Sequence, residues 1–340
     1  MRTTIALLTI FFCQASIEIF AQNIPRTVTE TCENYDPRAE PLEVEVVREE
    51  SDGGIITRYV RYVVGTFAGK KTRVAAFYAF PEKAKGLPGI IQVHGGGQFA
   101  RKQSAQFYAA RGYAAIAVNW GEKVIDQAGD PNTDWQGIPA GFLDPKHHNG
   151  VEASEGTIHK KAHPWNSSWI LYAAATRRAI TFLEQQAECD GERIGLQGHS
   201  MGGRLTVLTA IDPRIKAASP SVGGSGFLYT DIAGIPNSAR RMAAGPERDL
   251  YLKTLACQHY WPLVRCPVMF LGATNDFNSP MEFVLRGFNS MPNVVESRTS
   301  FTPHMNHRFT ADNMMARIRW FDTHLKKSFT FPATAKATMT

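Results

Sequence analysis

The sequence has little that would indicate a disordered, fibrous or nucleic-acid-binding protein. Charged residues make up only 20% of the 340 residues, and the only biased stretch is a Thr- and Ala-rich end at 331–340. The net charge is +6, but Lys and Arg are scattered and no basic run is interleaved with aromatic residues. A nucleic-acid partner is therefore not expected, because such proteins concentrate positive charge on one face. Hydrophobic residues, at 44%, are sufficient for a full-sized globular core.

Long hydrophobic runs are missing except near the N-terminus. There, Met1-Arg2 precedes an apolar run from Ile5 to Phe12, and Ala21 is a small residue at a suitable cleavage position. This pattern predicts a signal peptide over 1–21 and a secreted or periplasmic protein. A retained N-terminal anchor helix is the alternative. Because no other run is long enough to cross a bilayer, no stable membrane insertion is expected after cleavage.

Cysteine is also scarce, with five in the whole chain. Cleavage near residue 21 would leave Cys32, Cys189, Cys257 and Cys266, an even number that permits disulfides in an exported protein. Cys266 begins a predicted buried strand, where an unpaired thiol is common. We expect at most one bridge and no catalytic thiol, because no histidine motif accompanies any of the four.

The most informative stretch lies near the middle of the chain. A short apolar run at 194–197 leads into G-H-S-M-G at 198–202, and a predicted helix follows at 201–210. A strand, a sharp turn and a helix around G-x-S-x-G are the context of a nucleophilic serine, here Ser200. The glycines allow the strand and helix to approach closely. The alternative interpretation is a Gly-rich turn with an incidental serine.

The elements around this stretch predict an α/β fold with a mostly parallel sheet. Three strand candidates at 42–47, 56–67 and 72–80 are separated by short glycine turns, which predicts an antiparallel opening. Strands and helices then alternate, which is typical of parallel sheets with right-handed crossovers. The expected strands are 89–93, 114–120, 194–197, 215–219, 267–272 and 294–301, and the expected helices are 103–111, 167–186, 201–210, 280–290 and 311–326. Asn166 is the expected N-cap of the 167–186 helix.

Domain organisation follows from these elements. After the signal peptide we expect an extended N-terminal arm at 22–41, one domain at 42–330 and a tail at 331–340. Residues 121–165 and 223–264 interrupt the alternation, and both follow the carboxyl ends of predicted strands. Ligands bind at that edge of open α/β sheets, so we interpret the two segments as loops or a lid over the site. Surface decoration is the alternative.

A serine nucleophile needs a base and an acid that orients the base. In proteins with a G-x-S-x-G turn of this kind, the catalytic residues follow one another along the chain as Ser, then Asp or Glu, then His. Asp276 follows the strand at 267–272, and His307 follows the strand at 294–301. His304 competes with His307; we prefer His307 because it follows a turn-friendly asparagine and precedes the last helix, leaving His304 to support the base or face the substrate.

The oxyanion of an acyl-transfer intermediate needs backbone N–H donors. The N–H of Met201 is the first candidate, and the glycine loop after the strand at 89–93 offers Gly96 and, as second choice, Gly97. No metal is expected: the H-x-x-H pair at 304 and 307 has no Cys or carboxylate beside it, and His159 and His163 are interpreted as loop residues. No other cofactor is expected.

Four motifs carry a resemblance to a known group of proteins. They are His94 to Gly97, Gly198 to Gly203, Ala273 to Phe277 and Pro303 to Arg308. Over residues 55–326 the chain resembles an α/β-hydrolase, and within that group secreted bacterial acetyl xylan esterase-like or dienelactone hydrolase-like proteins. The resemblance implies a metal-free Ser-Asp-His esterase. Ser200 stands where true dienelactone hydrolases have cysteine.

Three functions remain in competition. The first is a serine esterase that deacetylates carbohydrate or another small-molecule or polysaccharide ester outside the cytoplasm. The second is a serine peptidase of the same fold, disfavoured because a dedicated propeller or cap domain is missing. The third is an inactive binding protein, which would not require all three catalytic residues. The acyl group, the alcohol and the oligomeric state are left open.

Overall fold

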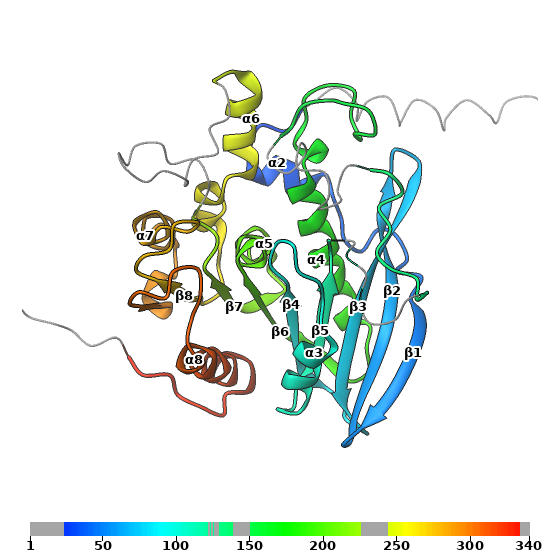
Figure 1. Ribbon diagram of the computed structural model, residues 1–340, viewed down its shortest axis with the longest axis vertical. Helices are drawn as coiled ribbons and strands as arrows, with labels where there is room; N and C mark the ends of the chain where they lie inside the picture. The colour runs from blue at the N-terminus through cyan, green and yellow to red at the C-terminus, as the bar shows by residue number, and fades with distance from the viewer. Residues whose placement is uncertain are drawn as a thin grey trace, which may run out of the picture.

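A computed structural model describes residues 24–121, 123, 125, 129–138, 150–225 and 244–333. A nine-stranded sheet forms its centre, in the order β1-β2-β3-β5-β4-β6-β7-β8-β9 (Figure 1). The strands are β1 (Glu45–Asp52), β2 (Ile55–Phe67), β3 (Lys70–Pro81), β4 (Leu87–Val93), β5 (Ala114–Asn119), β6 (Cys189–His199), β7 (Ile215–Ser221), β8 (Met269–Ala273) and β9 (Arg298–Thr302).

The sheet changes character along its width. Strands β1, β2, β3 and β5 pair antiparallel, joined at the first two steps by tight turns at Gly53-Gly54 and Gly69. From β5 across β4 to β9 every pair is parallel. The predicted antiparallel opening and parallel remainder are therefore confirmed. Parallel strands place all their carboxyl ends at one edge, so the segments after β4, β6, β8 and β9 meet there.

Helices cover both faces of the sheet. One hydrophobic core contains residues of α4, α5, α6 and α7, and the other contains residues of α3, α8 and the following helical turn (Figure 1). The bounds are α3 (Lys102–Ala109), α4 (Ser168–Glu184), α5 (Met201–Thr209), α6 (Pro246–Leu255), α7 (Met281–Phe288), α8 (Ala311–Phe321), and the helical turns η2 (Pro164–Asn166), η3 (Cys257–His259), η4 (Trp261–Leu263), η5 (Val294–Glu296) and η6 (Asp322–Lys326). Burial on both faces explains why the central strands β4, β5 and β8 are nearly continuous apolar runs, whereas the outer strand β1 is polar and largely exposed.

Two local predictions are wrong. The strand expected at 294–301 begins only at Arg298, because 294–296 forms the turn η5 and Val295 is 81% exposed. Its β-branched residues resemble a strand, but the preceding Pro292 and Asn293 start a turn. The N-cap of α4 is Ser167. Asn166 instead organises the preceding loop: its side chain accepts from the His159 N–H and donates to the Lys161 carbonyl.

The N-terminal arm is also not simply extended. Residues Val28–Glu33 form helix α2, and the hydroxyl of Thr27 caps it by accepting from the Glu30 N–H at 3.2 Å. Thr followed three residues later by Glu is a helix-start signal that the polar composition obscured. Arg178 of α4 then fixes the end of the arm.

The Arg178 guanidinium is buried and donates to four backbone carbonyls. Its partners are Val63 of β2 and Pro37, Glu40 and Pro41 of the arm, at 2.6–3.0 Å. Backbone carbonyls buried beside α4 need such a donor.

Some of the remaining sequence predictions concern residues that the structure does not describe. The expected signal peptide at 1–21 lies outside the described residues, as do 139–149 and 226–243 of the two expected lid segments. Within the described part of the chain, no helix is both long and apolar enough to span a bilayer.

Replacing Arg178 by Ala should lower the free energy of unfolding by about 2–4 kcal/mol, because it leaves several buried carbonyls without a donor. Arg38→Ala is the matched control, since Arg38 ties the same arm to α4 through Glu184 but its side chain is 58% exposed. That change should cost less than about 1 kcal/mol. Urea unfolding of both variants measures the difference, and equal losses would contradict the anchoring role of Arg178.

Candidate active site

Ser200 stands at a sharp turn between β6 and α5. Strand β6 ends at His199, helix α5 begins at Met201, and Ser200 between them has φ 59° and ψ −115°. Such a conformation is costly for a residue with a side chain and persists only where its surroundings enforce it. The Ser200 N–H donates to the Ser221 carbonyl at 2.9 Å, and the Ser200 carbonyl accepts from the Arg204 N–H at 3.1 Å.

Glycines around the turn leave no room for a side chain. A Cβ on Gly198 would lie 2.3 Å from the carbonyl oxygen of Gly202, and one on Gly202 would lie 2.2 Å from that of Val93. A Cβ on Gly223 would lie 2.0 Å from the carbonyl oxygen of Ser200. The first turn of α5 therefore packs directly on the ends of β4 and β7, as the G-x-S-x-G spacing predicts.

The His307 side chain lies between Ser200 and Asp276. Its Nε2 is 2.7 Å from Ser200 Oγ, and its Nδ1 is 2.9 Å from each carboxylate oxygen of Asp276. Because an ionised carboxylate only accepts hydrogen bonds, the ring proton belongs on Nδ1 and leaves Nε2 as an acceptor for the Ser200 hydroxyl. The Asp276 side chain is 1% exposed, and the His307 side chain 23%.

Hydrogen bonds from neighbouring residues fix the positions of Asp276 and His307. Asp276 Oδ1 accepts from the N–H groups of Asn278 and Ser279 at 2.8 and 3.1 Å, which orients the carboxylate. The loop that carries His307 is joined to the loop after β8, since the Asn306 N–H donates to Asn275 Oδ1 at 2.8 Å. The structure thus brings together residues from three loops far apart in sequence.

His304 does not join this chain of hydrogen bonds. Its backbone is left-handed at φ 58°, its N–H donates to Thr274 Oγ1 at 3.4 Å, and its side chain is exposed. The histidine within hydrogen-bond distance of Ser200 Oγ is His307.

The glycine loop after β4 packs against the serine turn. A Cβ on Gly95 would lie 3.1 Å from the His199 carbonyl, and Gln98 closes the loop by accepting from the Gly95 N–H at 3.2 Å. Gly97 has φ 68°, which favours glycine. Met201 is the first residue of α5, so its N–H has no partner within the helix and faces the N-terminal end. The candidate donors Met201, Gly96 and Gly97 therefore belong to two segments that adjoin Ser200.

His94 lies at the start of this loop and hydrogen-bonds to it. Sequence reasoning assigned no separate role to this residue. Its ring stacks on Trp120 with centroids 4.4 Å apart and an angle of 7°, and its Nδ1–H donates to the Gly95 carbonyl at 2.8 Å. Trp120 Nε1–H donates back to the His94 carbonyl at 3.2 Å, and Trp135 Nε1–H donates to the Trp120 carbonyl. Burial lowers the pKa of His94 to about 4. No local pattern signals this stack, because the two tryptophans come from later segments.

His199 is a second residue that sequence reasoning left without a role. The Ser221 hydroxyl donates to the Gly198 carbonyl, so the His199 Nδ1–H donates to Ser221 Oγ, at 3.2 Å. The His199 ring lies 5.7 Å from that of His307. Burial, aided by His307, lowers the pKa of His199 to about 4. His199 is therefore neutral near pH 7 and adds no positive charge beside the base.

Metal binding and thiol chemistry have less support in the described residues than the Ser200 site. Within the described ranges no group of three or more His, Cys, Asp or Glu side chains is arranged to hold a metal. His159 and His163 lie in the loop before η2, as predicted; their rings stack 3.5 Å apart, and His163 Nδ1 accepts from the Trp165 N–H. Burial raises the pKa of the Cys189 and Cys266 thiols to about 12, which disfavours the nucleophilic thiolate.

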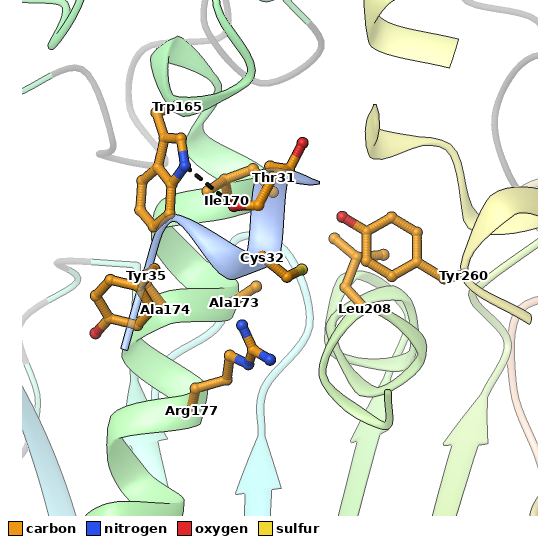
Figure 2. A pocket seen from close by; sticks show the side chains of 10 residues that line it. All are labelled: Thr31, Cys32, Tyr35, Trp165, Ile170, Ala173, Ala174, Arg177, Leu208 and Tyr260. Carbon is orange, nitrogen blue, oxygen red and sulfur yellow. Dashed lines mark hydrogen bonds between the residues drawn. The ribbon is translucent and has the colours of Figure 1, made fainter. Parts of the chain in front are cut away.

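A small cavity lies between helices α2, α4 and α5 (Figure 2). Its volume is about 10 Å³, and it is lined by residues of α2, α4 and α5 together with Tyr35, Trp165 and Tyr260. A space of this size holds one water at most. None of Ser200, Asp276 and His307 lines it, so it is a packing defect between helices and no substrate site.

This chain is similar to known esterases. A family model described as acetyl xylan esterase (AXE1) matches residues 38–228. Acetyl esterase Axe7A of Xylanibacter ruminicola is 22% identical over 276 residues, an alignment that covers 78% of this chain and 59% of the relative. This chain thus spans less than two thirds of that relative's length.

Two solved structures share the fold. The acetyl xylan esterase of Paenibacillus sp. R4 has a TM-score of 0.60 at 17% identity, covering 92% of this chain and 99% of that one. Acetyl xylan esterase 1 of Thermoanaerobacterium sp. has a TM-score of 0.62 at 15% identity, covering 91% and 97%. These matches confirm the α/β-hydrolase fold class.

The pKa of His94 predicts a pH-dependent stability. The pKa of His94 is about 4 in the folded chain and about 6.5 in the unfolded chain. As the pH falls from 6.5 to 4, the His94 side chain therefore takes up a proton only in the unfolded chain. Stability should therefore fall from pH 6.5 towards pH 4, by about 3 kcal/mol from this residue. His94→Phe, which keeps an aromatic ring against Trp120, should show a correspondingly shallower fall in urea unfolding, whereas exposed His304→Ala should match the wild type. Parallel profiles for His94→Phe and the wild type would refute the assignment.

Proposed function

Because this chain belongs to the acetyl xylan esterase (AXE1) family, we propose that it is a carboxylic ester hydrolase whose nucleophile is Ser200, base His307 and orienting acid Asp276. The observation that carries the proposal is the unbroken hydrogen-bond chain from Ser200 Oγ through His307 to Asp276. A serine hydroxyl is a weak nucleophile unless a base removes its proton during attack. This arrangement supplies that base, already in the required tautomer.

The proposed reaction has two halves. Ser200 Oγ attacks the ester carbonyl while His307 Nε2 takes the hydroxyl proton, and Asp276 stabilises the imidazolium without being protonated itself. His307 then gives this proton to the leaving alcohol oxygen as the bond between carbonyl carbon and alcohol breaks, leaving an acyl group on Ser200. A water molecule, deprotonated by His307, attacks the acyl-enzyme, and the acid departs as Ser200 regains its proton.

The negative oxygen of each intermediate requires donors on the side opposite His307. We assign this role to the N–H of Met201 and, from the glycine loop, to that of Gly96, with Gly97 as the alternative. The support is the close packing of that loop on the serine turn, where a Cβ on Gly95 would lie 3.1 Å from the His199 carbonyl oxygen. The α5 N-terminus adds a favourable dipole.

The substrate class rests on the family and its relatives. We propose acetylated carbohydrate or another small ester, met outside the cytoplasm. The acetyl xylan esterase family and the relative Axe7A, an acetyl esterase, support an acetyl group. Export rests on the predicted signal peptide alone.

The two histidines provide a matched test. His307→Ala should lower kcat on p-nitrophenyl acetate by at least about 10³-fold, because the base and the later proton donor are both lost. His304→Ala should retain most of the activity, since its side chain is exposed and outside the hydrogen-bond chain. Ser200→Ala sets the background rate, and circular dichroism checks that each variant is folded.

Three results would contradict the proposal. A larger loss in His304→Ala than in His307→Ala would move the base to His304. Wild-type cleavage of an aminoacyl p-nitroanilide in preference to the acetate would favour a peptidase, and inactivity on both would favour a binding protein.

A further inference from the structure

Phe277 is a large apolar side chain left in solvent next to the proposed acid. It directly follows Asp276, is 44% exposed, and its ring centroid lies 6.4 Å from that of His307. Single exposed apolar residues are common on protein surfaces, so exposure alone says little. Phe277 is a candidate for a role in binding because it lies beside His307, the proposed base.

The chain holds Phe277 firmly in this place. The Asp276 carboxylate accepts from the N–H groups of Asn278 and Ser279, so the backbone turns tightly around Phe277. The same carboxylate is bonded to His307, which fixes Phe277 relative to the base. A side chain on a turn fixed from both sides presents its surface with little ordering cost on binding.

The reaction proposed above decides which part of a substrate this ring meets. His307 must protonate the leaving alcohol oxygen, so the alcohol half of the ester lies within hydrogen-bond reach of His307 Nε2. The oxyanion donors assigned above belong to other segments, the start of α5 and the glycine loop after β4. A ring next to His307 therefore faces the alcohol half, and the acyl group lies elsewhere.

The surroundings of Phe277 indicate the chemistry of that alcohol. The two loops on either side of it carry mostly exposed polar residues, Thr274, Asn275, His304, Asn306 and Arg308, together with Pro303 and the half-buried Met305. A long alkyl alcohol would need a continuous apolar groove, whereas one aromatic face within a polar rim matches a molecule with an apolar face and polar edges. A pyranose has that form, with C–H bonds on its faces and hydroxyl groups around its edge. C–H groups are attracted to the negative face of an aromatic ring.

We propose that Phe277 is a specificity-determining residue that packs against a pyranose ring in the alcohol half of the substrate. This inference rests on the proposed esterase function and deepens it, since it assigns the sugar to the side of His307. Esters of small alcohols do not extend far enough to gain from the ring.

The test compares two acetyl esters that differ only in the alcohol. Phe277→Ala should lower kcat/KM on a methyl xylopyranoside acetate by about tenfold, the size of one good aromatic contact. It should leave kcat/KM on ethyl acetate within about twofold, because the acyl half and the chemistry are unchanged. Phe277→Tyr keeps the ring and should rescue the sugar ester. Val295→Ala is the matched control: Val295 is 81% exposed and lies in η5, before β9, at the opposite edge of the sheet.

The outcomes are separable. Equal losses of Phe277→Ala on both esters would mean that the ring acts through His307, and no loss on the sugar ester would mean that it binds nothing; either result overturns the inference while the esterase proposal stands. A wild type that hydrolyses neither ester overturns the proposed function itself.

Discussion

The strained backbone of Ser200 is the constraint on which the rest of the site depends. A residue at φ 59° and ψ −115° costs on the order of 1–3 kcal/mol, and the neighbouring Val222, at φ 44°, is a second unfavourable conformation. The surrounding contacts enforce both: Ser200 N–H bonds to Ser221, and Val222 N–H bonds to Leu271 at 2.9 Å. Glycine at 198, 202 and 223 is required because no Cβ fits in the resulting contacts. The turn places the Ser200 hydroxyl just beyond the carboxyl end of β6, where side chains of other loops can contact it.

The parallel half of the sheet determines which loops these are. Strands β4, β6, β8 and β9 end at one edge, so the glycine loop, Ser200, Asp276 and His307 converge although they span more than half the chain. Side chains and backbone groups then join the loops to one another: Asn275 to Asn306, Asp276 to His307, and His307 to Ser200. A site that is hydrogen-bonded in advance needs little reorganisation during reaction, which is the main physical source of electrostatic catalysis.

Much of this could be predicted from sequence because the signals are local. The elbow around Ser200 has a fixed spacing, and the change from antiparallel hairpins to alternating strands and helices is visible in turn residues and periodicity. The errors arose where local preference and tertiary contact disagree: 294–296 has β-branched residues but forms a solvent-facing turn, and 28–33 has polar residues but packs as a helix. The stack of His94 on Trp120 and the bond from His199 to Ser221 could not be predicted, since each joins residues whose contact only the fold creates.

The central claim is that Ser200 is activated by His307 and forms a covalent acyl intermediate. Labelling with a fluorophosphonate tests it directly, because the probe reacts with an activated serine and remains attached. Mass spectrometry of the intact protein should show one adduct in the wild type, peptide mapping should assign it to Ser200, and labelling should be lost in Ser200→Ala. An adduct that maps to another residue, or a folded wild-type protein that is not labelled, would contradict the account.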